Sequence, residues 1–359
     1  MGTVGSQAMW RLAARGAEVV GFDRFAPGHD RSGAGGDTRI FRFAASEGAE
    51  YVPLLRHADA LWRQLERESG RQLRDLTGCL LVGQAEDPTL PQSGADLEEL
   101  SAGKVAARFP GYRLAPDERA VFDRGGGCIH APLAVVAAAL RAEQLGARLH
   151  RYTTVTEVRA CDDGVDIVTD GGVQRFDRAV VAAGAWVGQL FPELGLPVDV
   201  RRNLSFWHPW QPPVRDAAAL PALIRASSPG FYGVPSPDGL TMKLGLTAEL
   251  HRSVDDPNRL DRAVAPEELD DFRRVIRAHL PGLHEEPTRL GAYMEAYSAD
   301  RHPLVGSMSG VPNVVFLAAF SGHGFKISPA IGDAAADLAL TDGTALPVAF
   351  LAADRSMAC

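Results

Sequence analysis

Residues 2–23 read GTVGSQAMWRLAARGAEVVGFD, and this stretch decides how the rest of the chain is interpreted. Gly2 and Gly5 precede an expected helix that ends near Ala14, and the following apolar run ends in Asp23. The spacing matches the last two glycines of a dinucleotide-binding turn, in which an acid about 20 residues later binds the ribose. The stretch therefore predicts the second half of a βαβ unit whose first strand, expected just before Gly2, is missing. Taken alone, two glycines favour a simple capping turn.

The remaining chain alternates between helical and β-rich segments. The clearest helix spans 51–69, where apolar residues recur on one face and Gly70 suits a C-terminal cap. Nucleotide-type segments lie at both ends and in the middle, which predicts an α/β fold. A Rossmann-like domain would be interleaved with a substrate domain built on a mostly antiparallel β-sheet. Further helices are expected over 132–145, 266–280 and 327–340. The expected boundaries are 1–45, 130–195 and 290–359 for the first domain, and 46–129 and 196–289 for the second.

The composition is that of an ordinary globular protein. At 359 residues the chain exceeds what one hydrophobic core usually serves, which also indicates two domains. The net charge of −8 argues against a nucleic-acid partner, which normally requires a basic surface. The four cysteines, Cys79, Cys128, Cys161 and Cys359, have neither metal-binding spacing nor the density of a disulfide framework. We find no signal peptide and no membrane-spanning run, so we expect a cytoplasmic protein. The cysteine spacing also leads us to expect no metal site.

The segment SGAGGDTRIFR (32–42) places two arginines behind a glycine-rich loop. If the segment is helical, Arg39 and Arg42 project from one face. There they could clamp a carboxylate or phosphate through bidentate hydrogen bonds. A solvated surface loop with ordinary ion pairs is an equally good interpretation.

The segment FSGHGFKISP (320–329) carries the strongest functional signal, because two glycines flank His323 between a buried strand and a helix. Lys326 falls in the first helical turn, where a cation is unfavourable with respect to the helix dipole unless an anionic ligand offsets it. The alternative is a strand-to-helix turn with an exposed lysine, and we favour the functional interpretation.

Two further segments are ambiguous. AAGAW (182–186) follows an apolar strand, and its small residues allow either a ligand or another backbone to approach closely. Strand alternation over 240–245 places Thr241 and Lys243 on one face, where a surface lysine on a solvated sheet is the simplest interpretation.

Together these segments resemble the monomeric sarcosine oxidase and N-methyltryptophan oxidase family, within the wider D-amino-acid-oxidase-like group of FAD enzymes. The residues that carry the resemblance are GDTRIFR (36–42), EYVPLL (50–55), AAGAW (182–186), YGVPSPDGLTMKLG (232–245) and FSGHGFK (320–326). Their order and spacing match over nearly the whole chain. GDTRIFR and FSGHGFK together are quite specific, whereas the glycine turn is not.

The resemblance implies a role for each matching residue. Asp23 would bind the adenosine ribose and Val155 the adenine edge, while Lys243 would promote the reaction with oxygen. Catalytic residues implied by the resemblance are Lys243, Arg39 and Thr38. Substrate-binding residues are Arg42 and Lys326, which would hold a carboxylate, and Tyr232, Glu295 and Thr247. FAD-binding residues are Gly2, Gly5, Asp23, Arg39, Val155, Gly184, Trp186, Gly322, His323, Gly324 and Lys326.

Three departures from the family pattern stand out. The position of a flavin-linking cysteine in close relatives is Tyr293 here, so we expect non-covalent FAD. Glu295 and Thr247 take the places of a cavity tyrosine and a cavity histidine. An acid in the cavity would suit a cationic or hydroxylated substrate better than sarcosine. The missing first strand is the third departure.

The function that the resemblance implies is an FAD-dependent oxidase of the C–N bond of an amino acid, or of an N-methyl or cyclic secondary amino acid. The products are an imine and hydrogen peroxide. Its partners would be a small amino acid substrate and O2, with no nucleic acid and no membrane, and the enzyme would be a monomer. Two alternatives remain: a flavin dehydrogenase that uses another electron acceptor, and a truncated family member without catalytic activity.

Overall fold

The computed structural model describes residues 1–33, 35–84, 86–87, 90, 96–212 and 219–355. Helix α1 (Thr3–Ala14), which the glycine turn predicts, packs against α4 (Ala131–Gln144) and α7 (Gly324–Thr341). Small residues allow this close packing: a Cβ on Gly332 would lie 2.7 Å from the backbone nitrogen of Ala8. The expected helices over 132–145 and 327–340 are thus confirmed, although α7 begins three residues earlier than predicted.

Helix α2 (Tyr51–Ser69) has the amphipathic face and the C-terminal cap that the sequence predicts. Gly70 adopts the left-handed conformation with φ of 64°. The buried face of α2, which includes Leu54 and Trp62, packs into the same apolar cluster as α1, α4 and α7. Residues 51–69 were expected in the substrate domain, but the helix packs on the Rossmann-like side because its apolar stripe faces α7.

Two separate small sheets contain parallel strand pairs. Strand β1 (Val20–Phe22) pairs with β8 (Arg148–His150), and β12 (Ala179–Val181) pairs with β20 (Val311–Ala318), both in parallel. Strand β19 (Leu304–Met308) joins β20 from the other side in antiparallel orientation. Within the described residues no strand precedes α1, and no strand connects β1 to β12.

The largest sheet has nine strands, in the order β17-β13-β16-β15-β14-β4-β6-β5, with β18 on the other edge of β13. Its neighbours are antiparallel except for β14 and β4, which agrees with the expected α/β fold with a mostly antiparallel sheet. The strands are β4 (Cys79–Gln84), β5 (Leu97–Ser101), β6 (Glu118–Asp123), β13 (Asp199–Pro209), β14 (Ala222–Arg225), β15 (Phe231–Pro235), β16 (Thr241–Leu246), β17 (Arg252–Ser253) and β18 (Arg289–Tyr297).

Helix α6 (Asp270–His279) covers this sheet, because Phe272, Val275 and Ile276 on its apolar face join the cluster around Phe206. The helix expected over 266–280 is shorter than predicted, since its first turn is a separate 3₁₀ turn over Pro266–Leu269. Strand β18, expected in the first domain, instead forms ladder hydrogen bonds with β13 of the large sheet.

The remaining elements connect or flank these layers. The short helices are α3 (Ala102–Arg108) and α5 (Val187–Leu190). The strands of the two other small sheets are β2 (Thr38–Phe41), β3 (Arg74–Asp75), β7 (Gly127–His130), β9 (Val155–Cys161), β10 (Gly164–Thr169) and β11 (Gly172–Phe176).

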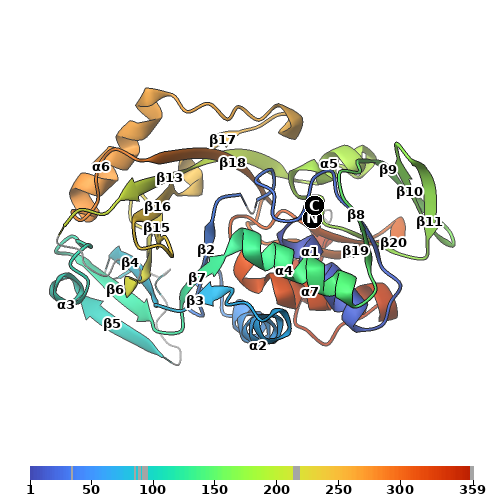
Figure 1. Ribbon diagram of the computed structural model, residues 1–359, viewed down its shortest axis with the longest axis horizontal. Helices are drawn as coiled ribbons and strands as arrows, with labels where there is room; N and C mark the ends of the chain where they lie inside the picture. The colour runs from blue at the N-terminus through green and yellow to red at the C-terminus, as the bar shows by residue number, and fades with distance from the viewer. Residues whose placement is uncertain (34, 85, 88–89, 91–95, 213–218, 356–359) are drawn as a thin grey trace.

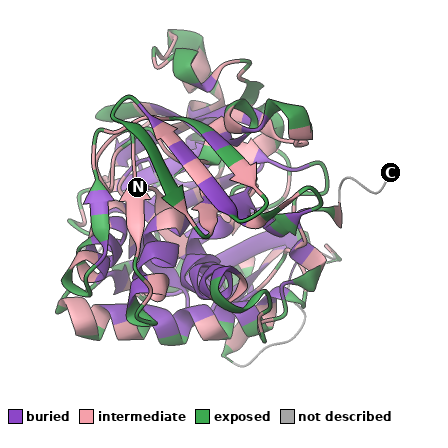
Figure 2. Ribbon diagram, turned by 90° about the vertical axis from the view of Figure 1, so that its right-hand side faces the viewer, coloured by how far each residue is buried: buried purple, intermediate pink, exposed green. Residues whose placement is uncertain are grey.

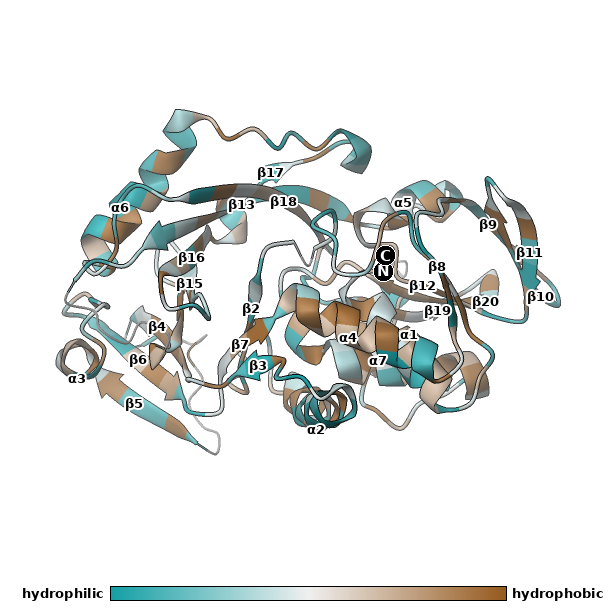
Figure 3. Ribbon diagram, viewed as in Figure 1, coloured by the Kyte–Doolittle hydropathy of each residue, from teal (hydrophilic) through white to brown (hydrophobic). Residues whose placement is uncertain are grey.

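The figures show how these layers are arranged. Figure 1 shows the large sheet and α6 on one side and α1, α4 and α7 on the other, with β2 between them. Buried residues concentrate in the packed helices and inner strands, and exposed residues lie on the outer turns (Figure 2). Apolar residues are frequent along α4, whereas the outer strand β11 is largely hydrophilic (Figure 3). Strand β2 therefore links the helical half to the half that carries the large sheet.

Candidate active site

A cavity of about 1670 Å³ is lined by residues from both halves of the molecule. The N-termini of α1 and α7 and the ends of β1 and β12 contribute from one half, and β18 contributes from the other. The predicted site residues that line it are Gly2, Gly5, Asp23, Arg39, Val155, Gly184, Trp186, Glu295, Gly322 and Gly324. Thr38, Arg42, Tyr232, Lys243, Thr247, His323 and Lys326 lie outside the described lining.

The N-terminus of α1 is an anion-binding element. Gly2 caps the helix in an extended conformation, and the first turn contains no acidic residue, so its amide N–H groups are available to a phosphate. Asp23 lies at the end of β1, where its carboxylate accepts a hydrogen bond from the Phe25 amide at 2.6 Å. The same carboxylate forms an ion pair with the amino group of Met1. The glycine turn and the acid thus lie at the same cavity, as the dinucleotide-binding pattern predicts.

A tight turn presents the N-terminus of α7 to the cavity. Ser321 and Gly322 have positive φ angles of 51° and 83°, which turns the chain sharply between β20 and the helix. Burial lowers the pKa of His323 to about 4, so the ring is neutral near pH 7. Its Nδ1 lies 3.2 Å from the carbonyl of Ser321 and must donate to it. Lys326, in the first turn of α7, is only 4% exposed, which rules out the exposed-lysine interpretation.

Two buried cations and one partly buried acid meet beside this turn. The Lys326 ammonium and the Arg42 guanidinium each donate to the same Glu47 oxygen, both at 2.6 Å. Burial acts to raise the pKa of Glu47, but Arg42 and Lys326 outweigh it and lower that pKa overall. Among the described residues, the second Glu47 oxygen and Arg42 Nη1 are buried without a hydrogen-bond partner. The cluster therefore holds a carboxylate and retains an unused donor.

The sequence did not indicate Glu47. It follows Arg42 by five residues in a loop, and neither periodicity nor spacing distinguishes it from a surface acid. The only available signal was the pair of cations expected to hold a substrate carboxylate, since two cations inside a protein need an anionic partner.

Arg39 and Arg42 do not share a helical face, because residues 38–41 form strand β2 paired with β7. Side chains three apart in a strand point to opposite faces, which separates the two arginines. Arg39 donates to the carbonyls of Gly33 and Gly35, both at 2.7 Å, and so holds the glycine-rich loop at the cavity. Arg42 instead reaches Glu47.

Lys243 is buried rather than exposed, with 1% of its surface accessible, which overturns the surface-lysine interpretation. Its side-chain nitrogen Nζ donates to the carbonyl of Thr38. Burial and the nearby Arg39 hold the pKa of Lys243 well below its usual value. Within the described chain no carboxylate lies within ion-pair distance of Lys243. Strand β16 thus directs the Lys243 side chain toward β2, whose Arg39 lines the cavity. Among the described residues this lysine has no ion pair.

The remaining predicted residues, Tyr232, Glu295 and Thr247, lie on strands of the large sheet or directly after one. Tyr232 packs over Gly245, its cross-strand partner, and burial followed by Glu295 raises the pKa of Tyr232. The Glu295 carboxylate accepts a hydrogen bond from the Tyr297 hydroxyl at 2.7 Å. Thr247 packs against Gly230, and its side chain hydrogen-bonds to Glu249.

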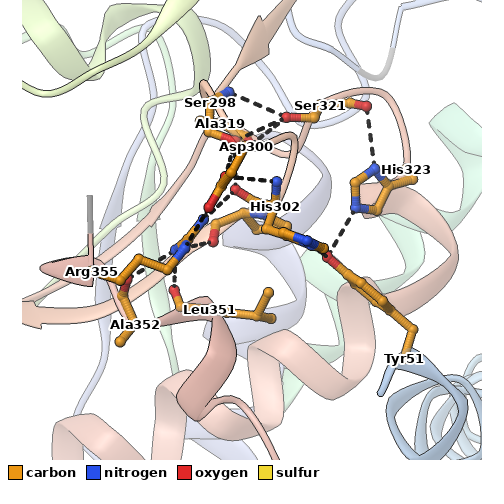
Figure 4. A network of polar contacts seen from close by, with 11 residues as sticks. Tyr51, Ser298, Asp300, His302, Ala319, Ser321, His323, Leu351, Ala352 and Arg355 are labelled. Carbon is orange, nitrogen blue, oxygen red and sulfur yellow. Dashed lines mark hydrogen bonds and ion pairs between the residues drawn. The ribbon is translucent and has the colours of Figure 1, made fainter. Parts of the chain in front are cut away.

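A chain of polar contacts leads from His323 to the outer loops (Figure 4). The Tyr51 hydroxyl lies 3.3 Å from His323 Nε2 and 2.7 Å from His302 Nδ1. Because Nδ1 of neutral His323 is the donor, its Nε2 accepts from Tyr51, and His302 donates to Tyr51. Arg355 donates to the His302 carbonyl at 2.7 Å and to Asp300. Sequence reasoning missed this chain, because its members are far apart in the sequence.

The described cysteines, Cys79, Cys128 and Cys161, are free and lie outside the cavity lining, and Cys359 is outside the described residues. Tyr293 packs against Gly35, where a Cβ would lie 2.1 Å from the tyrosine ring. The described residues contain no group of three His, Cys, Asp or Glu that could hold a metal ion. None of the helices in this part of the chain is long and apolar enough to cross a bilayer.

Comparison with known proteins places this site in a family. The family described as FAD dependent oxidoreductase matches residues 1–338. Monomeric sarcosine oxidase of Streptomyces avermitilis is 33% identical, over 97% of this chain and 94% of its own. N-methyl-L-tryptophan oxidase of Escherichia coli (strain K12 / DH10B) is 29% identical over 94% of this chain and 92% of its own. The open form of NikD, an unusual amino acid oxidase essential for nikkomycin biosynthesis, superposes with a TM-score of 0.86 at 26% identity, over 98% of this chain and 95% of that one. The chain therefore belongs to the FAD-dependent oxidoreductase family, in the group that contains monomeric sarcosine oxidase and N-methyl-L-tryptophan oxidase.

Proposed function

We propose that the protein oxidises the C–N bond of an amino acid, or of an N-methyl or cyclic secondary amino acid, to an imine and reduces O2 to hydrogen peroxide. The observation that carries the proposal is the buried pair of Arg42 and Lys326, which already binds a carboxylate, that of Glu47, at 2.6 Å. Lys326 directly follows Gly324 and Phe325, which line the cavity at the start of α7. A substrate carboxylate bound there would place its neighbouring carbon and nitrogen toward the cavity.

The residues present fit FAD. Two helix N-termini open on a cavity of about 1670 Å³, which suits a ligand with a pyrophosphate and a second anionic centre. We assign Asp23 to the ribose, Gly2 and Gly5 to the pyrophosphate, and the turn around Gly322 to the flavin ring. When bound, FAD accepts a hydride equivalent from the substrate and passes the electrons on to oxygen.

The chain itself supplies orientation and charge. Arg42 and Lys326 fix the substrate carboxylate, so that the reacting carbon is held in one orientation. Lys243 is the group that we assign to oxygen activation, because a buried amine without an ion pair can stabilise negative charge that develops beside it. Because His323 is neutral near pH 7, Lys326 is the residue of this turn that we assign as the cation.

The first experiment is an absorption spectrum of the purified protein, followed by a peroxide assay with a panel of N-methyl and cyclic amino acids. We expect a flavin spectrum whose chromophore is released by acid precipitation, since no described cysteine lines the cavity. We also expect oxygen uptake with at least one substrate. Turnover with an artificial acceptor but not with oxygen would instead favour the dehydrogenase alternative. A colourless protein that takes up no added FAD would favour the non-catalytic alternative.

The pH dependence of carboxylate binding tests Lys326 specifically. Burial and the nearby Arg42 lower the pKa of Lys326 to about 8. The ammonium is therefore charged below that pH and loses its proton, and its attraction for a carboxylate, above it. The affinity for a carboxylate without an amine is expected to fall by about 10- to 100-fold between pH 7 and 10, as a charged hydrogen bond is lost.

The measurement is a spectral titration of the FAD-bound protein at each pH, with Lys326→Met as the comparison. The variant should bind the carboxylate weakly at pH 7 and show little change up to pH 10. The same fall with pH in both proteins would remove Lys326 from the anchor.

We also propose that the enzyme acts as a monomer in the cytoplasm. The similarity to relatives called monomeric sarcosine oxidase supports the oligomeric state. Size-exclusion chromatography with light scattering at working concentration tests it, and a dimer mass would contradict it.

A further inference from the structure

Glu295 lines the cavity as an acid that has no cationic partner among the described residues. It lies on β18 and lines the cavity together with Gly322 and Arg39. Its described hydrogen bond comes from the neutral Tyr297 hydroxyl, at 2.7 Å. In the described parts of the chain, no lysine, arginine or histidine nitrogen lies within 4.0 Å of its carboxylate. A half-buried carboxylate of this kind is costly to maintain unless a ligand compensates it.

The nearby arginines are engaged elsewhere. Arg201 is the cross-strand partner of Glu295, yet its Nε donates to Asp199 at 2.6 Å and its Nη1 donates to the carbonyl of Ala248. The guanidinium of Arg301 stacks over the Tyr297 ring, 4.8 Å from its centre. Glu47, by contrast, accepts hydrogen bonds from two cations, Arg42 and Lys326, both at 2.6 Å. The structure therefore pairs one acid of the site with two cations, whereas the described residues give the other acid no cationic partner.

The position of Glu295 relates it to the substrate. A Cβ on Gly322 would lie 3.4 Å from Glu295 Oε2, so the carboxylate packs on the turn that opens α7. Burial and then Glu295 raise the pKa of Tyr232, and Glu295 partly opposes the burial that lowers the pKa of Lys243. It thus lies between the α7 turn and the strand that carries Lys243, at a distinct place from the Arg42–Lys326 anchor.

The geometry points to a substrate that carries a second positive charge, in addition to the reacting amine and the carboxylate, with Glu295 as the residue that selects it. This inference rests on the proposed oxidation of an amino acid at the same site. The reacting amine is a poor candidate for the partner of Glu295. A carboxylate beside it would stabilise the ammonium form, which cannot give up a hydride equivalent until it loses its proton. A basic side chain, such as that of a diamino acid, can keep its charge throughout the reaction.

The test compares substrates that differ only in this charge. Side-chain-cationic N-methyl amino acids of increasing length, from N-methyl-2,3-diaminopropionate to N-methyl-lysine, are each paired with a linear aliphatic N-methyl amino acid of matched length. We expect kcat/KM to favour the charged member of at least one pair by about 10- to 100-fold, the range for a buried charge pair. Glu295→Gln should bring that ratio close to one, Glu295→Asp should retain part of it, and Tyr297→Phe should retain most of it.

Three outcomes would overturn the inference. The wild-type enzyme could prefer the uncharged member of every pair. Glu295→Gln could lower both members equally, which would make the acid a general part of the site. The variant could change the flavin spectrum or potential without changing the ratio, which would make Glu295 a cofactor contact.

Failure of the proposed function is distinguishable from failure of this inference. If no amino acid is oxidised, the oxidase proposal fails, while spectral titration with lysine and norleucine still measures the charge preference of the site. Binding that favours lysine in the wild type but not in Glu295→Gln would then support a cation site on its own. Equal binding of both ligands in both proteins would reject it.

Discussion

Replacing Arg42 with alanine is expected to lower kcat/KM by about 30- to 1,000-fold for every substrate that carries a carboxylate. The guanidinium is 5% exposed, and it shares a carboxylate with Lys326 in the structure. Truncating one member of a buried charge pair costs about 2 to 4 kcal/mol, which corresponds to that range. The loss should appear mainly in KM if the carboxylate contact is the same in the ground state and the transition state.

Two comparisons make this prediction specific. An amine without a carboxylate should be oxidised equally slowly by the wild type and by Arg42→Ala, because the missing contact is not used. Arg277→Ala, which removes an exposed arginine paired with Glu285, should leave kcat/KM unchanged. Unchanged kinetics of Arg42→Ala with all carboxylate substrates would exclude the anchor role.

Replacing Lys243 with methionine is expected to slow the reaction of the substrate-reduced enzyme with oxygen by about 10²- to 10³-fold, the effect of losing one preorganised charge-stabilising donor. Methionine keeps the volume of a side chain that is 1% exposed and removes only the amine. The low pKa of Lys243 means that its positive charge becomes favourable mainly when negative charge develops nearby. The amine should therefore contribute most during oxygen reduction.

Stopped-flow kinetics separate the two half-reactions. Anaerobic reduction by substrate should change much less than reoxidation by oxygen in Lys243→Met. Lys104→Met, which alters an exposed lysine of α3, should match the wild type in both steps. Equal losses in both half-reactions would assign Lys243 to the structure of the site rather than to oxygen.

Local rules predict much of the fold from the sequence. The cap at Gly70, the amphipathic face of α2 and the turn at Gly2 depend on neighbouring residues alone, and all three are found in the structure. Strand β2 was open to misassignment because its ladder partner β7 is about 90 residues away. The β-branched residues and the phenylalanine of TRIF already favour a strand, and the pairing with β7 forms it.

The same difference between local patterns and distant contacts separates the site residues that the sequence predicts from those that it does not. The glycine turn at Gly2 and Gly5 and the acid Asp23 carry recognisable local patterns and line one cavity, together with Gly322 and Gly324 of the FSGHGFK segment. The burial of Lys243 depends on strand β16 facing Thr38, 205 residues earlier in the chain. Glu47 and the Tyr51–His302 contact gain their meaning only from partners that folding brings together. A single sequence records none of these distances.

The Arg42–Lys326–Glu47 cluster also sets a charge stoichiometry for the ligand. Two cations and one anion leave a net charge of +1, so a single added carboxylate brings the buried cluster to neutrality. A dianion such as a phosphate monoester would leave excess negative charge in a buried place, which is strongly unfavourable. Without Glu47, Arg42 and Lys326 would not discriminate between a monoanion and a dianion in this way. Glu47 thus makes the cluster selective for ligand charge. Monoanions can bind, whereas doubly charged metabolites, which two unpaired cations would attract, are disfavoured.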